Sequence, residues 1–448
     1  MRCSVIVKIC VCFFGWYKKG YDKMKWIIHP SALTGSITIP PSKSHTIRAF
    51  LVGALAKGES IIRRPLLKGD GASAIRAATS LGARVDINGE DVYIGGVGGD
   101  MSLGTDVIDM ANSGTGLNLF CSAAALGERA RRFDGDASLR TRPVRPLFDA
   151  LEQLGVRVTA DGGGQDVPFT VQGPLRGGRA QVNGLSSQFV SSLLFACPLA
   201  PEDTHITVFD LHEQPYVEIT LWWLANQGIE IEYSRELTTY NIRSGQSYKP
   251  FDMAIPADFS SAAFPAVAAA IAGDAIELHG LDFSDPQGDK EVFRHLETMG
   301  ARISRSGTSV TVFGSRLEGA ILDLNAMPDA LPALAVAAAA AQGETVFTNV
   351  EQARIKETDR IAVMAAELGK MGISVRELPD GMVVQGGSLQ GAHVNSHYDH
   401  RVAMALALAG MIANGETVID GAEAAAITYP SFVDDFLKLG ADINVVGE

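Results

Sequence analysis

Leu151-Glu-Gln-Leu-Gly155-Val-Arg-Val158 is a stretch that recurs in variant form, six times in all, along this chain. It combines the end of an amphipathic helix, a glycine and the start of an alternating β-strand. The six glycines are separated by 73, 73, 72, 72 and 68 residues: Gly82, Gly155, Gly228, Gly300, Gly372 and Gly440. A helix C-terminus favours glycine because the residue after it often has a positive φ. The stretch therefore predicts a repeated unit of roughly 70 residues.

A second, more apolar helix lies between successive glycines. The expected helices cover residues 48–57, 117–126, 189–199, 262–272, 330–342 and 402–414. A helix that is apolar on all sides must be buried, whereas the glycine-ended helices keep a polar face. Solenoid repeats usually span roughly 20 to 50 residues, so two globular domains of three units each fit the length better. We therefore expect an α/β fold of two domains.

The composition is that of a globular protein. Hydrophobic residues make up 46% of the 448 residues, and the net charge is −13. So acidic a chain does not favour a nucleic-acid or anionic-membrane partner, and no apolar run reaches the roughly 20 residues of a membrane span. The five cysteines form no Cys-x-x-Cys pair, which fits a reducing cytoplasm. Residues 1–23 resemble neither the rest nor a secretory signal, and we expect an N-terminal extension outside the fold or, alternatively, a short targeting segment.

Polar residues precede each apolar helix. These groups are Ser42–Ser44, Asn112–Thr115, Ser186–Gln188, Asp258–Ser261, Met327–Asp329 and Tyr398–Arg401. Each group can cap its helix, and for one group alone a cap without further function is the simpler interpretation. Three buried helices in each of two facing domains would, however, point six positive helix ends at one cleft. The pattern predicts an anion-binding cleft between two domains.

Two charged segments could carry chemistry. Residues 354–360 hold five charges and lead into a helix that we expect over 360–371. We expect Lys356 and Arg360, four residues apart, to share one face, with Glu357 beside them. A carboxyl group between two cations can be tuned for proton transfer. Arg142 lies in an arginine-rich, proline-stiffened loop that suits carboxylate or phosphate binding. Solvated charged loops are the alternative in both cases.

Three histidines have a spacing that suggests a metal site. His393, His397 and His400 follow an i, i+4, i+7 pattern. Their segment does not have the character of a helix, and no carboxylate completes a ligand set. We expect no metal site.

The order and spacing of these segments resemble the 5-enolpyruvylshikimate-3-phosphate synthase family from about Met24 onward. The resemblance is carried by Ser42-Lys-Ser-His-Thr-Ile-Arg48, Asn112-Ser-Gly-Thr115, Arg142-Pro143, Ser186-Ser-Gln-Phe189, Gln287-Gly-Asp289, Pro328-Asp329, Lys356-Glu-Thr-Asp-Arg360 and Asp399-His-Arg401. It implies a two-domain inside-out α/β barrel of six βαβαββ units, three per domain, whose buried inner helices point at the cleft. It also implies one domain of residues 24–41 plus 256–448 and another of residues 42–255.

The resemblance implies transfer of the enolpyruvyl group of phosphoenolpyruvate to the 5-hydroxyl of shikimate 3-phosphate, a step of aromatic amino acid biosynthesis. Asp329 is then the expected base and Glu357 the expected acid, while Lys43 bridges both substrates. The expected phosphoenolpyruvate ligands are Lys43, Gly114, Arg142, Gln188, Arg360 and Arg401. The expected shikimate 3-phosphate ligands are Lys43, Ser44, Arg48, Ser186, Ser187, Gln188, Tyr216, Asp329, Gln352 and Lys356. No metal or organic cofactor is implied, and we expect a cytoplasmic monomer.

Three residues depart from the family pattern. Ile427 replaces a usual lysine, Glu213 stands where a serine often contacts the substrate, and Gln352 replaces a common asparagine. A lost contact to a buried anion costs roughly 1.5–3 kcal/mol, so Ile427 predicts a weaker phosphoenolpyruvate site.

Two alternatives remain for the activity. One is the fold relative that transfers enolpyruvyl to UDP-N-acetylglucosamine, which carries a cysteine just upstream of the position of Arg142, whereas residues 127–141 contain none. The other is a non-catalytic anion-binding relative, which Ile427 favours only weakly. The presence of Lys43, Asp329 and Glu357 argues against it.

Overall fold

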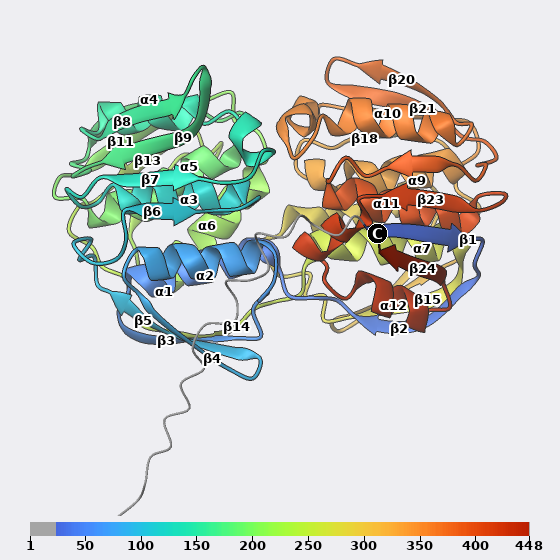
Figure 1. The fold of residues 1–448 in the computed structure, drawn as a ribbon, viewed down its shortest axis with the longest axis horizontal. Helices are drawn as coiled ribbons and strands as arrows, with labels where there is room; N and C mark the ends of the chain where they lie inside the picture. The colour runs from blue at the N-terminus through green and yellow to red at the C-terminus, as the bar shows by residue number, and fades with distance from the viewer. Residues whose placement is uncertain (1–23, 448) are drawn as a thin grey trace, which may run out of the picture.

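The structure, a computed structural model, describes residues 24–447 and consists of two lobes that lie side by side (Figure 1). One hydrophobic core is formed by residues between 47 and 255, and the other by residues 26–39 and 259–443. We call these the middle lobe and the terminal lobe, and we propose that they are the domains 42–255 and 24–41 plus 256–448. The extension predicted at residues 1–23 lies outside the described residues.

The lobes are built from six four-stranded sheets with one topology. In β6 (Val107–Asp109), α3 (Gly114–Ala124), β7 (Arg131–Asp134), α4 (Arg145–Gln153), β8 (Arg157–Gly162) and β9 (Gln165–Gln172), the strand order is β6-β7-β9-β8. The first two strands are parallel and the other pairs antiparallel. The same unit recurs twice more. One copy consists of β10 (Gly178–Asn183), α5 (Ser187–Ala196), β11 (Thr204–Phe209), α6 (Gln214–Asn226), β12 (Ile231–Tyr233) and β13 (Thr239–Ile242). The other consists of β18 (Ile321–Asp323), α9 (Leu331–Ala340), β19 (Glu344–Thr348), α10 (Arg360–Lys370), β20 (Ser374–Leu378) and β21 (Gly381–Gln385). These are the predicted βαβαββ units.

The other three sheets each include a strand from a distant part of the chain. β14 (Asp252–Ala254) joins β3 (Lys57–Arg63), β4 (Arg84–Asn88) and β5 (Asp91–Val97), whose helices are α1 (Lys43–Leu55) and α2 (Asp70–Ser80). β2 (Leu33–Thr38) joins β15 (Gly273–His279), β16 (Arg302–Ser306) and β17 (Ser309–Phe313), with α7 (Phe259–Ala272) and α8 (Glu291–Thr298). β1 (Met24–His29) joins β22 (His393–Asn395), β23 (Thr417–Asp420) and β24 (Asp442–Gly447), with α11 (His400–Ile412) and α12 (Phe432–Lys438). All six sheets have the four strands of the unit, but in only three of them do the strands follow one another in the sequence.

The apolar helices α1, α3 and α5 form the centre of the middle lobe, and α7, α9 and α11 that of the terminal lobe. Their side chains are almost fully buried, as the absence of a polar face predicts. Except for α9, they begin earlier than predicted, because the polar residues before them form part of the first turn. Between residues 24 and 447, no helix has both the length and the apolar character that crossing a membrane demands.

The six repeat glycines confirm the predicted helix ends. Their φ angles lie between 71° and 107°, in the left-handed region. At Gly300, an added Cβ would lie 3.5 Å from the nearest atom, the carbonyl oxygen of Arg316. A side chain there fits the space, so its cost is that of the backbone conformation alone.

We therefore expect Gly300→Ala to lower the free energy of unfolding by about 1–2 kcal/mol, the cost of a left-handed alanine. Gly369→Ala is the matched control, because Gly369 is helical, with no atom within 4 Å of an added Cβ. That control should raise stability, since alanine is the better helix former. Unfolding in urea measures both variants, and equal stability of the two would contradict the prediction.

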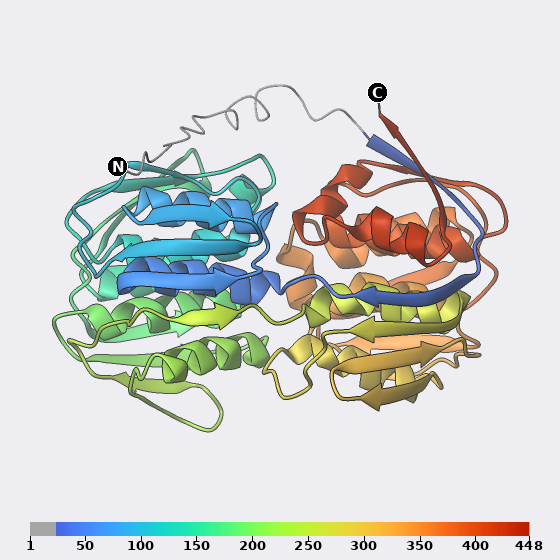
Figure 2. The same cartoon turned by 90° about the horizontal axis from the view of Figure 1, so that it is seen from below.

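The chain crosses between the lobes twice, at one place. Pro41 and Ala257 form an antiparallel bridge. The N–H of Ser42 donates to the carbonyl oxygen of Pro256 at 2.8 Å, and that of Asp258 to Pro40 at 2.9 Å. Figure 2 shows the two connecting segments side by side. Helices α1 and α7 begin directly after these crossings, so their first turns lie at the junction of the lobes.

Candidate active site

Five of the six inner helices are capped by the polar residues before them. Ser42, Ser113, Ser186, Asp258 and Asp399 each accept a hydrogen bond from a backbone N–H of the first turn. The cap predicted at 327–329 is wrong, because residues 328–330 form a 3₁₀ turn and no side chain caps α9. The carboxylate of residue 329 is thereby free for other contacts.

Asp329 lies between two buried arginines. Its two carboxylate oxygens are 2.7 Å from Arg360 Nη1 and 2.8 Å from Arg401 Nη2. Burial would raise the pKa of Asp329, but the charges of Arg401, Arg360 and Lys43 outweigh burial and hold this pKa well below its usual range. Asp329 is therefore an ionised carboxylate at neutral pH, able to accept a proton.

Glu357 connects this arginine pair to the middle lobe. Its Oε2 accepts a hydrogen bond from Arg360 Nη2 at 2.6 Å, and its Oε1 is 3.1 Å from Arg142 Nη2. The hydroxyl of Ser138, also in the middle lobe, donates to the Glu357 carbonyl oxygen at 3.2 Å. Burial would raise the pKa of Glu357, but Arg142 and Arg360 hold it well below its usual range. The side chain is thus a second carboxylate in the cleft.

Lys356 provides another connection between the lobes. The prediction that it shares a helical face with Arg360 is wrong, because α10 begins only at Arg360. Lys356 instead extends to the middle lobe and pairs with Glu213. The other carboxylate oxygen of Glu213 accepts a hydrogen bond from Ser187 Oγ at 2.8 Å. Cation and carboxylate thus come from different lobes in this pair.

Arg48 is a buried cation in the middle lobe whose hydrogen bonds go to neutral oxygens. It donates to Thr220 Oγ1 at 3.0 Å and to the carbonyl oxygens of Ser44 at 3.0 Å and Tyr216 at 2.9 Å. Burial lowers its pKa to about 9, so it still carries its charge at neutral pH. A buried charge of this kind is stabilised by an anionic ligand.

Gln188 and Gly114 lie at the first turns of two neighbouring helices. The Gln188 side chain accepts a hydrogen bond from Asn118 Nδ2 at 2.8 Å and donates to Thr115 Oγ1 at 3.2 Å. A Cβ added to Gly114 would come within 2.3 Å of Arg142 Nη1. A residue without a side chain is therefore needed for the guanidinium to occupy its place.

These groups surround a small cavity between the lobes, of about 40 Å³. All the predicted site residues line it except Arg360, Arg401, Ser186 and Gln352. The two arginines contact its wall at Asp329. Ser186 caps α5 and lines an adjoining hollow, and Gln352 donates to the carbonyl oxygen of Asn325 at 3.1 Å. The sequence motifs therefore meet around the cavity between the lobes, whereas Gln352 does not line it.

Sequence reasoning missed the acidic partners of the cleft. Asp70 Oδ2 is 3.7 Å from Lys43 Nζ, Asp399 Oδ2 is 2.8 Å from Arg360 Nε, and Asp289 accepts a hydrogen bond from the Tyr216 hydroxyl at 2.7 Å. Burial, together with the nearby Asp329 charge, raises the pKa of Asp289 to about 6. Asp289 and Asp399 lie within motifs that resemble the family, so both could have been found there. No signal marked Asp70 beyond its place at a helix start.

One group of residues has the atoms to hold a metal ion within the described part of the chain. The ligand atoms of Glu357, Asp399 and His400 lie within 4.8 Å of one another. Arg360 donates hydrogen bonds to both carboxylates, so a guanidinium already supplies positive charge there. The other two histidines of the predicted spacing pair elsewhere, with Asp420 and Glu367. The three histidines therefore share no site.

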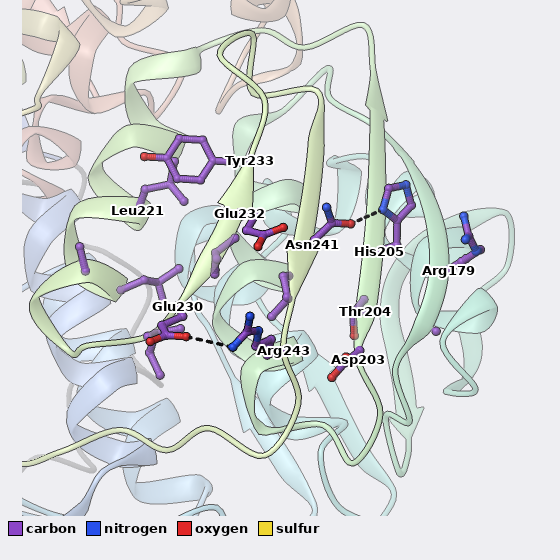
Figure 3. A pocket seen from close by; sticks show the side chains of 16 residues that line it. Arg179, Asp203, Thr204, His205, Leu221, Glu230, Glu232, Tyr233, Asn241 and Arg243 are labelled. Carbon is purple, nitrogen blue, oxygen red and sulfur yellow. Dashed lines mark hydrogen bonds and ion pairs between the residues drawn. The ribbon is translucent and has the colours of Figure 1, made fainter.

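A larger hollow, of about 780 Å³, lies beside α6 on the β10–β13 sheet (Figure 3). Two of its charged side chains, Glu230 and Arg243, form an ion pair at 3.6 Å. His205 Nδ1 is 2.7 Å from Asn241 Oδ1 in the same hollow. None of the predicted site residues lines it, so we place the site in the interlobe cavity.

Solved structures identify the fold. Enolpyruvyl transferase NikO from Streptomyces tendae matches with a TM-score of 0.76 at 19% sequence identity, covering 95% of this chain and 99% of that one, which shows a shared fold. EPSP synthase from Acinetobacter baumannii matches with a TM-score of 0.78 at 28% identity, covering 95% of this chain and all of that one. The fold is that of the enolpyruvyl transferases.

Sequence comparison narrows the class to one family. The profile of EPSP synthase (3-phosphoshikimate 1-carboxyvinyltransferase) matches residues 27–436. The 3-phosphoshikimate 1-carboxyvinyltransferase of Acetivibrio thermocellus is 46% identical over 417 residues, covering 93% of this chain and 98% of that protein. That of Ruminiclostridium cellulolyticum is 45% identical over 419 residues, covering 94% and 99%. The chain belongs to the EPSP synthase family, which confirms the resemblance of its motifs.

Proposed function

We propose that this protein is a transferase that moves the enolpyruvyl group of phosphoenolpyruvate to the 5-hydroxyl of shikimate 3-phosphate, in aromatic amino acid biosynthesis. Family membership supports the reaction. The observation that carries it is the convergence of six cations from both lobes on one cleft, in a protein of net charge −13. They are Lys43, Arg48, Arg142, Lys356, Arg360 and Arg401. Both substrates are anions, so this cleft suits them.

The cations fall into two groups, one for each substrate. Arg48 and Lys356 would hold the phosphate of shikimate 3-phosphate, with Ser44, Ser187 and Tyr216 beside them. Arg142, Arg360 and Arg401 would hold phosphoenolpyruvate, with the Gly114 backbone and Gln188. Lys43, between the groups, would contact both substrates. The hydrogen bonds of Arg48 to neutral oxygens support the first assignment.

The two carboxylates supply proton transfer. Asp329 would take the proton of the 5-hydroxyl while the hydroxyl oxygen forms a bond to C2 of phosphoenolpyruvate. Glu357 would give a proton to C3. Glu357 would then take back a C3 proton as the C2–O bond to phosphate breaks, which restores the C2–C3 double bond. The departing phosphate would take the proton held by Asp329, so both carboxyl groups return to their starting states. Glu357 is ionised in the free protein because of Arg142 and Arg360. Substrate anions that neutralise these arginines raise its pKa and let it carry the proton.

Among residues 24–447, no cysteine lines the cleft. Cys121 and Cys197 are buried in the core of the middle lobe. Burial raises the pKa of both thiols, that of Cys197 to about 12. The nucleotide-sugar alternative, whose relatives carry a loop cysteine, is therefore the weaker one. The resemblance to the family also supports a cytoplasmic monomer without a metal or organic cofactor.

Phosphate release tests this function. The protein is mixed with phosphoenolpyruvate and either shikimate 3-phosphate or UDP-N-acetylglucosamine. We expect phosphate only with shikimate 3-phosphate. Release with the nucleotide sugar alone would overturn the proposed acceptor, and no release with either would favour a non-catalytic binding protein.

A further inference from the structure

A carboxylate of the protein already binds two of the residues that we propose as ligands of shikimate 3-phosphate. One oxygen of Glu213 pairs with Lys356 and the other accepts a hydrogen bond from Ser187. Glu213 also lines the interlobe cavity, along with Arg48 and Tyr216. It therefore lies where the acceptor phosphate is expected to bind.

The backbone and its surroundings hold Glu213 in this place. The residue is 1% exposed and its φ of 56° and ψ of 40° are left-handed, a conformation rare for a side chain of this size. Its N–H donates to Asn325 Oδ1 of the terminal lobe at 3.4 Å. Glu213 cannot swing freely into solvent, so a ligand must compete with its carboxylate.

The charges make this competition direct. A phosphate monoester carries roughly two negative charges at neutral pH, and Glu213 already pairs with the charge of Lys356. Like charges brought together in a binding site oppose association. Arg48, which is not paired with a carboxylate among its hydrogen bonds, remains the cation that can attract the phosphate.

We infer that Glu213 limits the affinity of the acceptor site, because its carboxylate competes with the acceptor phosphate for Lys356 and Ser187. This inference rests on the proposed function. Because Glu213 and Lys356 belong to different lobes, their contact also joins the lobes before the acceptor arrives. When the acceptor binds, the ion pair between Lys356 and Glu213 is replaced by one between Lys356 and the acceptor phosphate.

Glu213→Gln tests the inference, because it removes the charge and keeps an oxygen that can accept from Ser187. We expect the KM for shikimate 3-phosphate to fall roughly tenfold or more as the like-charge repulsion disappears. The KM for phosphoenolpyruvate should change by no more than about twofold, because the substitution leaves the proposed ligands of phosphoenolpyruvate intact. Calorimetric titration with shikimate 3-phosphate alone should show a matching fall in Kd. Glu218→Gln, at an exposed position of α6, the helix that follows Glu213, is the matched control and should change neither value.

The outcomes separate this inference from the function on which it rests. Wild-type protein that releases no phosphate with shikimate 3-phosphate overturns the proposed function. Active wild-type protein with an unchanged or higher KM for shikimate 3-phosphate in Glu213→Gln overturns the inference alone, because Glu213 would then support its partners. If the glutamine variant does not fold, Glu213→Ser carries the same expectation and the same refuting result.

Discussion

Asp329→Ala will lower kcat by about 10³-fold, within the range that removal of a general base gives. Asp329 is the carboxylate that Arg360 and Arg401 hold in the cleft and keep ionised. In the proposed mechanism Asp329 takes the 5-hydroxyl proton as the new bond forms, so the alanine variant lacks the proposed base. The same change frees both arginines for the anionic substrate, so the KM for phosphoenolpyruvate should not rise. Steady-state kinetics with both substrates measures this split.

Two further variants separate chemistry from folding at this position. Asp329→Asn keeps the shape of the side chain and removes the charge, and we expect it to be as slow as the alanine variant. Asp274→Ala, at an exposed position of β15, should keep wild-type rates. A wild-type-like kcat in either residue-329 variant would remove the proposed base. A large increase in the KM for phosphoenolpyruvate would show that Asp329 mainly shapes the arginine pair.

Glu357→Gln will lower kcat by roughly 10²- to 10⁴-fold, because an amide cannot give the proton that C3 must receive. The acid form of Glu357 is scarce in the free protein, where Arg142 and Arg360 hold its pKa low. Once substrate anions neutralise these cations, the pKa rises and the acid form becomes available. The wild-type kcat should therefore fall as the pH rises through the pKa of the complex, and Glu357→Gln should lose this pH dependence. A pH profile of kcat shows both effects.

The stability of Glu357→Gln should be compared with that of the wild-type protein at neutral pH. The folded-state pKa of Glu357 is below its usual value, so its stabilising pairs are present above that usual value and are lost as the pH falls through the lowered one. At neutral pH the wild-type pairs are intact, and a thermal melt shows what the variant loses. Glu344→Gln, at an exposed position of β19, is the control. Undiminished turnover by Glu357→Gln would exclude it as the acid.

The repeat and the buried helices could be predicted because their signals are local. A glycine with positive φ ends each glycine-marked helix, and apolar residues on all sides mark each inner helix. The positions of Lys43, Asp329 and Glu357 in one cleft followed from family motifs and their order. The cap expected at Asp329 was not found, because the proline before it starts a 3₁₀ turn.

Contacts between distant segments could not be predicted in the same way. The residues of β2 and of the three-residue strand β14 do not themselves specify which sheet each strand completes. The pair Lys356–Glu213 joins residues 143 positions apart in different lobes, so charge alone did not show that these two would meet. The helical spacing assumed for Lys356 and Arg360 failed because a helix boundary lay between them.

The place of β1 affects how the chain folds during synthesis. The middle lobe is contiguous, and its last strand, β14, ends at Ala254, so all of its strands exist before half of the terminal lobe has been made. β1 must wait for β23 and β24, the final strands of the chain. Until they emerge from the ribosome, Trp26 and Ile28, both buried in the finished fold, have no sheet to join. A nascent chain of this design carries its earliest apolar strand unpaired for most of its translation, as a target for chaperones that bind such segments.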